Sequence, residues 1–242
     1  AADPAYAEWQ YHLGISHDRI ASLLEARNDF AAALAEYRIA LALAGRLQAA
    51  EPDNAMLLRN LGVAHGHIGD VLFALGDLAG ALQAYEAKRA IIGRLVEGNS
   101  YDSTWQHELG ASHARLALVL EARKDFPAAA REYEACLAIA MRLAAAERDN
   151  AQAQLNLAVN YRKLAEVHHL LGNSRQALLE LRQGREIVLA ILDTAPAMQL
   201  GVGDLALFES RISALEGRAS AGPSAGRLRR HWRALLGARA RG

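Results

Sequence analysis

Apolar side chains along residues 57–104 form two successive stripes at helical spacing. The first stripe falls at intervals of three, four and seven residues, typical of one face of an amphipathic helix; its members are Leu57, Leu61, Ile68, Leu72 and Leu75. A break at Gly76-Asp77 precedes the second stripe, which comprises Leu78, Ala81, Leu82, Tyr85, Ile92 and Leu95. The pattern predicts two helices of about 18–22 residues, joined by a turn short enough to make them antiparallel.

The same pattern recurs four times at a fixed interval of 48 residues, without insertion or deletion. Its most regular columns are Leu13, Leu61, Leu109 and Leu157; Ala33, Ala81, Ala129 and Ala177; and Tyr37, Tyr85, Tyr133 and Leu181. We predict four repeats, at residues 9–56, 57–104, 105–152 and 153–199. A single hairpin cannot bury its apolar stripe, whereas stacked hairpins can, so the predicted fold is an all-α solenoid of antiparallel helix pairs.

One stretch of the second copy, "IGDVLFALGDLAGALQAYEAKRAI", resembles a tetratricopeptide repeat (TPR). The residues that carry this resemblance are Gly69, Leu72, Gly76, Leu78, Ala81 and Tyr85. The usual period is about 34 residues, and the longer period is similar to a lengthened variant common in bacterial multidomain proteins, with openings such as "WQHELGASHARLA". The resemblance covers residues 1 to about 199 and implies a right-handed superhelix that acts as a protein-interaction scaffold. The fourth copy departs most, at His168, Ser174 and Leu181.

The two ends of the chain fall outside the four copies. Residues 2–9 align with residues 51–57, so we expect residues 1–8 to be the end of a preceding repeat or a linker in a longer protein. Residues 200–217 predict a helix that caps the array. Within them, residues 201–206 superficially match a dinucleotide fingerprint, but neither a strand nor a βαβ unit accompanies them, so we interpret them as a turn before the capping helix.

Charge is unevenly distributed although the formal net charge is zero. Residues 218–242 carry seven arginines and no acidic residue, so the other 20 basic residues share residues 1–217 with all 27 acidic ones. This tail reads as an Arg-rich linker followed by a basic amphipathic helix. Its candidate contact residues are Arg227, Arg229, Arg230, Trp232 and Arg233. The alternatives for it are nucleic acid, an anionic membrane, the acidic body, or a disordered solubilising terminus.

Catalytic and metal chemistry find little support. His17, His65 and His113 occupy one repeat position, and stacked helices lie roughly 10 Å apart, too far to share one zinc ion; we expect a polar ladder between helices. The single cysteine, Cys136, excludes an intrachain disulfide and fits a reducing compartment, so we expect a cytoplasmic protein. It has no local base. We predict no enzyme activity, no metal, no cofactor and no small-molecule substrate.

The resemblance places the first helix of each pair along a concave groove. By register, that groove carries thirteen candidate partner-binding residues: Tyr11, Asp18, Ser22, Glu25, Arg59, Asp70, Phe73, His107, Leu118, Glu121, Arg162, Glu166 and His169. They vary between copies while the core columns stay nearly constant, as expected of a tailored binding surface; an ordinary solvated face is the alternative. Because acidic residues outnumber basic ones, we expect a basic or mixed helical peptide as ligand. Other domains of the same chain are further candidate partners, and the setting implied is a bacterial signalling or regulatory protein.

Overall fold

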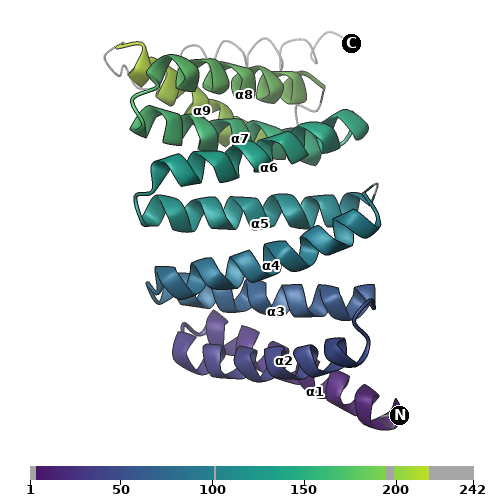
Figure 1. The fold of residues 1–242 in the computed structure, drawn as a ribbon. Coiled ribbons are helices and arrows are strands. Elements are labelled where there is room, and N and C mark those ends of the chain that lie inside the picture. Colours follow the sequence, from purple (N-terminus) through teal and green to yellow (C-terminus); the bar gives the residue numbers. More distant parts are fainter. Residues whose placement is uncertain (1–3, 101, 195–198, 218–242) are drawn as a thin grey trace. The chain divides into compact units, whose positions relative to one another are not determined.

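The structure, a computed structural model, describes residues 4–100, 102–194 and 199–217, and every regular element in them is an α-helix (Figure 1). The helices are α1 (Pro4–Ala26), α2 (Phe30–Ala50), α3 (Ala55–Ala74), α4 (Leu78–Gly98), α5 (Ser103–Ala122), α6 (Phe126–Ala146), α7 (Ala151–Leu170), α8 (Ser174–Thr194) and α9 (Gln199–Leu215). The predicted all-α class of paired helices is confirmed. Residues 4–8, expected to belong to a preceding repeat or linker, lie in α1. The tail at 218–242 lies outside the described residues.

The turn within each helix pair has one conformation throughout. The second residue after the first helix adopts a positive φ at all four equivalent positions, which are Asn28, Gly76, Lys124 and Gly172. At the second of these turns the Asp77 N–H donates to the Leu72 carbonyl at 2.9 Å, which completes a Schellman motif. Asp77 then caps α4 by accepting from the Gly80 N–H at 2.9 Å. Gly76 and Asp77 therefore both end α3 and begin α4, and the chain reverses its direction within these two residues.

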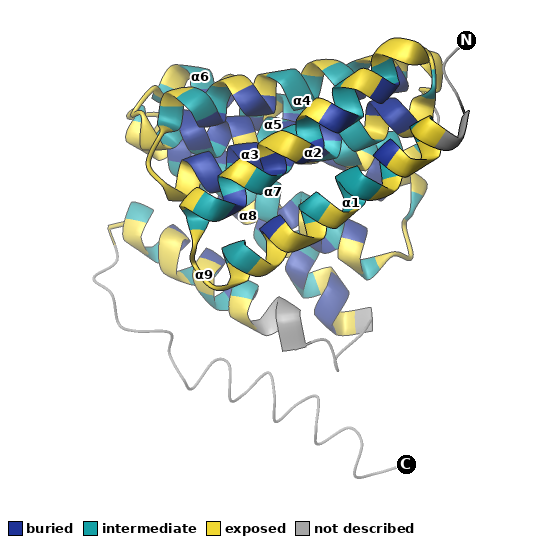
Figure 2. Cartoon of the chain, turned by 90° about the horizontal axis from the view of Figure 1, so that it is seen from below, coloured by how far each residue is buried: buried dark blue, intermediate teal, exposed yellow. Residues whose placement is uncertain are grey.

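The chain divides into two compact units, residues 1–139 and 140–242, with the boundary inside α6. In unit 1 the second-helix alanines and tyrosines pack against the first helices, and one core runs from Ala21 in α1 to Val119 in α5. In unit 2 the core joins α7, α8 and α9 around Val188 and Phe208. Figure 2 shows the buried residues on the facing sides of the helices and the exposed residues on their outer sides.

The first helix of unit 1 exposes a face that is buried in the later copies. Val71, Val119 and Val167 are 0% exposed, whereas Leu23, at the same repeat position, is 68% exposed. Ile20 is likewise exposed although Ile68 is buried. In the described residues α3 packs against α2 and α5 packs against α4, and the valines at this position are buried in both helices. Equivalent repeat positions therefore differ in burial between α1 and the later first helices.

Helix α9, the last one in the described residues, continues the repeat register. Leu205 lies 48 residues after Leu157 and is buried in α9, which packs on α8. Phe208 is fully buried against Gly184, where an added Cβ would lie 2.5 Å from the phenyl ring. The prediction of a turn at residues 201–206 was wrong, because these residues lie inside α9. Packing on α8 outweighs the low helix propensity of the two glycines there.

Candidate peptide-binding face

All thirteen residues predicted for the groove lie on first helices, and each is exposed or half-buried. We define the first-helix face by the ten that belong to unit 1: Tyr11, Asp18, Ser22 and Glu25 on α1; Arg59, Asp70 and Phe73 on α3; and His107, Leu118 and Glu121 on α5. The remaining three, Arg162, Glu166 and His169, lie on α7 in unit 2. That these side chains contact a partner stays a prediction.

A buried tyrosine anchors one carboxylate of this face in each of the first three helix pairs. The tyrosine hydroxyl donates a hydrogen bond from the second helix to an acidic side chain of the first helix. The three bonds are Tyr37 to Glu25 (2.9 Å), Tyr85 to Asp70 (2.6 Å) and Tyr133 to Glu121 (2.6 Å). The tyrosine column therefore does more than fill the core, because it orients three of the predicted site residues.

The hydroxyls of Tyr37 and Tyr85 stay protonated donors at neutral pH. Burial, reinforced by the Glu25 carboxylate, raises the pKa of Tyr37 to about 12. Burial and the bond to Asp70 also raise the pKa of Tyr85. A protonated hydroxyl next to a carboxylate forms a charge-assisted hydrogen bond, which is stronger than a neutral one. The hydroxyls of Tyr37 and Tyr85 therefore act as the donors that hold Glu25 and Asp70 in place.

The anchored acid alternates between two positions three residues apart on the same helix face. The pairs of residues at these positions are Ser22 and Glu25 in the first copy, Asp70 and Phe73 in the second, and Leu118 and Glu121 in the third. Each copy thus has one acid for its tyrosine. In the second copy the ring of Tyr85 lies over Gly69, where a Cβ would come within 2.6 Å of it; the other copies have alanine at this position.

Polar contacts also join successive first helices of unit 1. Nδ1 of His67 on α3 donates to Oδ1 of Asp18 on α1 at 2.8 Å, and the His67 ring lies 4.9 Å from that of Tyr37. Nη1 of Arg115 on α5 lies 3.2 Å from Oδ1 of Asp70 on α3. These half-exposed links fix the positions of the carboxylates, although they contribute little stability each.

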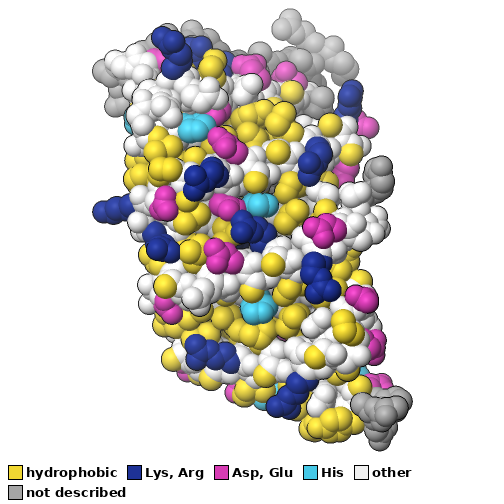
Figure 3. All heavy atoms as spheres, viewed as in Figure 1, with side chains coloured by type: hydrophobic (Ala, Val, Ile, Leu, Met, Phe, Trp, Pro, Cys, Tyr) yellow, Lys and Arg dark blue, Asp and Glu magenta, His cyan; other side chains and the backbone are white. Residues whose placement is uncertain are grey.

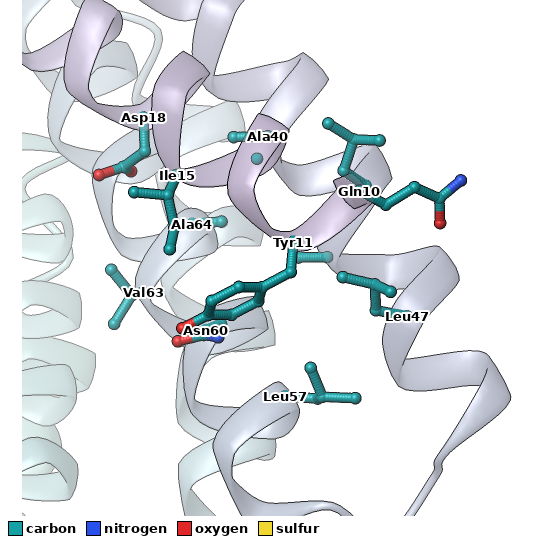
Figure 4. A pocket seen from close by; sticks show the side chains of 13 residues that line it. Gln10, Tyr11, Ile15, Asp18, Ala40, Leu47, Leu57, Asn60, Val63 and Ala64 are labelled. Atoms are coloured by element: carbon teal, nitrogen blue, oxygen red, sulfur yellow. The ribbon is translucent and has the colours of Figure 1, made fainter. Parts of the chain in front are cut away.

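A small pocket opens between α1, α2 and α3, and two residues of the first-helix face line it (Figure 4). Its volume is about 120 Å³. The apolar lining includes Ile15, Leu43, Leu47, Leu57 and Val63, and the polar lining comprises Gln10, Tyr11, Asp18 and Asn60. Figure 4 shows Tyr11 of α1 and Asn60 of α3 reaching toward one another. The pocket is therefore an apolar depression with hydrogen-bonding groups around it.

The fourth copy replaces the tyrosine arrangement by arginines. Leu181 occupies the tyrosine position, and Glu166 instead accepts from Arg162 at 3.0 Å and lies 3.7 Å from Arg211 of α9. His169 contacts the hydroxyl of Ser174 at 3.3 Å. The acid on α7 thus contacts two arginines, whereas Glu25 and Glu121 of unit 1 each accept a hydrogen bond from a tyrosine and, among the described residues, form no ion pair with a basic side chain. The predicted residues therefore differ in chemistry between the two units.

The histidines that share one repeat position bind within their own helix pairs. His17 pairs with Glu36, and His113 pairs with Glu132 at 2.6 Å. In the second copy Ala84 occupies the position of that glutamate, so His65 has no such acidic partner. Burial lowers the pKa of His65. The expected ladder is therefore a set of separate contacts inside hairpins. In the described part of the chain, no group of three or more His, Cys, Asp or Glu residues could hold a metal ion.

The single cysteine, Cys136, is buried. Burial raises the pKa of the Cys136 thiol to about 11, so the thiol is protonated at neutral pH. On the side that Figure 3 shows, basic, acidic and hydrophobic side chains are interspersed in the described residues. Across the described ranges, no helix has the length and apolar character needed to span a bilayer. The predicted tail residues, from Arg227 to Arg233, lie outside these ranges.

Comparison with known proteins supports the fold assignment. No protein-family model and no curated protein sequence matches the chain. Among solved structures, BtubC (BKLC) from P. vanneervenii is similar, with 18% identity over 98% of this chain and 91% of that chain, at a TM-score of 0.64. A putative kinesin light chain with nearly identical TPR-like repeats, from Podosopora anserina, has 18% identity over 96% of this chain and 98% of its own, at 0.58. The chain therefore has a TPR-type helical-repeat fold.

Two features of the face escaped the sequence analysis. The tyrosine–acid bonds were missed because the acid alternates between two columns, although one acid per copy at these positions is visible in the sequence. The pocket was missed because it arises from differences in side-chain volume between copies, such as Ala44 and Ile92, which a shared apolar pattern does not reveal. Both involve contacts between helices that periodicity alone does not specify.

Proposed function

We propose that this chain is a protein-interaction scaffold that binds a basic peptide or helix on its first-helix face. The observation that carries the proposal is the set of tyrosine-anchored carboxylates on successive first helices, Glu25, Asp70 and Glu121. The TPR-type fold supports a binding role over a catalytic one, because function in such folds resides in the surface that the repeats present.

The anchored carboxylates retain binding capacity. Each tyrosine bonds to one oxygen of its acid, and in the described residues the second oxygen (Oε1 of Glu25, Oδ2 of Asp70 and Oε1 of Glu121) accepts no hydrogen bond. A lysine or arginine of a ligand can pair with these oxygens without breaking the tyrosine bonds. Because the carboxylates are already oriented, binding requires less ordering of the protein.

The rest of the face favours an amphipathic rather than a purely charged ligand. Phe73 is exposed and Leu118 is half-buried, at the positions that alternate with the acids. A helix with basic side chains and an apolar stripe would match both kinds of group. In keeping with the resemblance to lengthened bacterial repeats, we place this surface in the repeat section of a larger signalling or regulatory protein.

A peptide-display experiment tests the proposal. The probe is a library of random peptides, selected on the full chain and counter-selected on the variant Glu25→Gln/Asp70→Asn/Glu121→Gln. The amides keep an oxygen that accepts from each tyrosine but remove the charge, so the fold should persist. We expect enrichment of peptides with spaced Lys or Arg and apolar residues. Failure to enrich any peptide, or enrichment that is equal on the variant, would overturn the proposal.

A charge-matched variant controls for net charge. Glu86→Gln/Glu97→Gln/Asp53→Asn removes the same three charges from exposed positions on α4 and the loop before α3. Peptides that recognise the anchored carboxylates should bind this control as they bind the natural chain. Equal losses on both variants would show that only overall charge matters.

A further inference from the structure

The pocket between α1, α2 and α3 has a filled counterpart one repeat later. Its residues Gln10, Ala40, Ala44, Leu57 and Asn60 correspond, at the 48-residue interval, to Leu58, Lys88, Ile92, Trp105 and Glu108. We call the space between α1, α2 and α3 the first interval and the space between α3, α4 and α5 the second interval. At four of these five positions, all except Gln10, the side chain in the first interval is smaller than its counterpart in the second. The largest such residue in the second interval is Trp105, where the first interval has Leu57. The backbone framework is similar, because α2 and α4 have the same length, as do α3 and α5, and α1 and α3 end at equivalent repeat positions. The difference in side chains therefore opens the space.

In the filled interval the chain supplies its own occupant. Leu58, Ile92 and Leu95 form a buried cluster against which Trp105 packs. Beside it, Nζ of Lys88 forms an ion pair with Glu108 at 2.9 Å. The space between two successive first helices thus accommodates a bulky apolar side chain, Trp105, next to a cationic one, Lys88. The first interval lacks both groups and leaves a volume of about 120 Å³.

This volume suits one apolar side chain. An apolar protein cavity of ~150 Å³ accepts a benzene molecule, so about 120 Å³ accommodates a leucine side chain or most of a phenylalanine ring. The lining supplies apolar walls from all three helices, and the polar groups of Tyr11, Asp18 and Asn60 are placed to bind a peptide backbone next to the inserted side chain. Two of these polar residues, Tyr11 and Asp18, belong to the first-helix face.

We propose that this pocket is the specificity subsite of the first-helix face, and that it receives one leucine- or phenylalanine-sized side chain of the bound basic peptide. The proposal rests on the proposed function for the identity of the ligand. It adds that an apolar residue of the peptide is recognised, and that the pocket between α1, α2 and α3 recognises it. The carboxylates select for basic residues along the peptide, and the pocket fixes the register by admitting a single apolar side chain.

The variant Ala44→Ile tests this subsite. It copies the residue that the next interval accommodates at the same position, so it should fill the pocket without unfolding the chain. Ala42→Ile is the matched control, because Ala42 lies two residues away on the exposed side of α2. Leu57→Trp fills the pocket from α3 and keeps the test valid if Ala44→Ile folds poorly.

Two readouts separate the pocket from the proposed function. In the first, N-acetyl-phenylalanine amide and N-acetyl-leucine amide are titrated into the methyl-labelled full chain. We expect shifts of the Ile15 and Val63 methyl signals, their loss in Ala44→Ile or Leu57→Trp, and their retention in Ala42→Ile. Absence of these shifts, or their persistence in both filled variants, would overturn the subsite. This readout needs no peptide, so it stands even if the display selection fails.

The second readout uses a peptide from the selection. Burying a leucine or phenylalanine side chain corresponds to about 10- to 100-fold in affinity. Changing one large apolar residue of the peptide to alanine should weaken binding to the natural chain by that factor, but should have little effect on binding to Ala44→Ile. If every apolar residue of the peptide matters equally in both proteins, the peptide binds the face but not the pocket, and the subsite is wrong while the proposed function survives.

Discussion

Replacing Gly69 with alanine should destabilise this chain, although alanine is the residue at this position in the neighbouring copies. A Cβ at Gly69 would lie 2.6, 2.8 and 2.9 Å from three ring atoms of Tyr85, whereas ordinary contacts measure 3.4–4 Å. Tyr85 is only 2% exposed, and its hydroxyl is bound to Asp70 at 2.6 Å. The ring must therefore move by roughly 1 Å against a packed core, and this strains or breaks its bond to Asp70.

The magnitude follows from two opposing effects. Overpacking a core typically costs about 1–3 kcal/mol, while the change from glycine to alanine within a helix contributes about 0.5–1 kcal/mol of stability. The net loss should be about 0–2.5 kcal/mol. Gly93→Ala is the matched control, because nothing lies within 4 Å of a Cβ built there, and it should gain about 0.5–1 kcal/mol. The two alanine variants should therefore differ by about 1–3 kcal/mol.

Urea and thermal unfolding followed by circular dichroism measure this difference. For a chain of this size, 1 kcal/mol corresponds to about 2–4 °C in Tm. A third variant, Gly69→Ala/Asp70→Ser/Phe73→Glu, copies the first repeat and gives Tyr85 an acid in the other column, so it should recover stability. Equal unfolding of Gly69→Ala and Gly93→Ala, or no recovery in the triple variant, would refute the reasoning. It would show that the position of the acid that binds Tyr85 does not depend on whether residue 69 is glycine or alanine.

Three further predictions follow from the same structure. Lys124→Gly should stabilise the chain by about 0.5–1 kcal/mol in urea unfolding, because Lys124 has a φ of 61°, which strains a residue with a Cβ; a loss of stability would argue against that turn. Ala81→Leu should lower stability by about 1–3 kcal/mol, because Ala81 is fully buried, and unchanged thermal unfolding would contradict this packing. Burial lowers the pKa of His65, so the unfolded chain binds its proton more readily, and stability should fall as pH drops below about 6.5. His65→Gln should reduce that fall between pH 7 and pH 5, and an equal fall in both proteins would exclude the histidine.

The repeat, the helix pairs and the turns between them could be predicted from the sequence. The breaks at Asn28-Asp29 and Gly76-Asp77 are turns with positive φ followed by a capping aspartate, and both features follow from local backbone chemistry. The capping helix was expected, but its relation to the repeats was missed, although Leu205 continues the leucine column at the same interval. The glycines at 201 and 203 suggested a turn, because local propensity gives no information on packing against α8.

The chemistry of the face was only partly predictable. Register placed Glu25, Asp70 and Glu121 on first helices, but it gave no indication of their bonds to the tyrosines. Their bonds to the tyrosines cross from one helix to the next, and which acid is reached depends on ring positions within a packed core. The pocket likewise depends on the difference between Ala44 and Ile92, two residues that both fit an apolar stripe. Such contacts require coordinates because they depend on side-chain volume rather than on periodicity.

The central claim is that tyrosine-anchored carboxylates bind a basic peptide, and titration calorimetry with a selected peptide tests it most directly. Three half-exposed charge pairs at about 0.5–1 kcal/mol each correspond to about 10- to 100-fold in affinity. We predict that Glu25→Gln/Asp70→Asn/Glu121→Gln weakens binding by this factor, and that Glu86→Gln/Glu97→Gln/Asp53→Asn leaves the Kd within about two-fold, given the small energy of exposed charges distant from the ligand. An unchanged Kd in the first variant, with the fold intact by circular dichroism, would contradict the account.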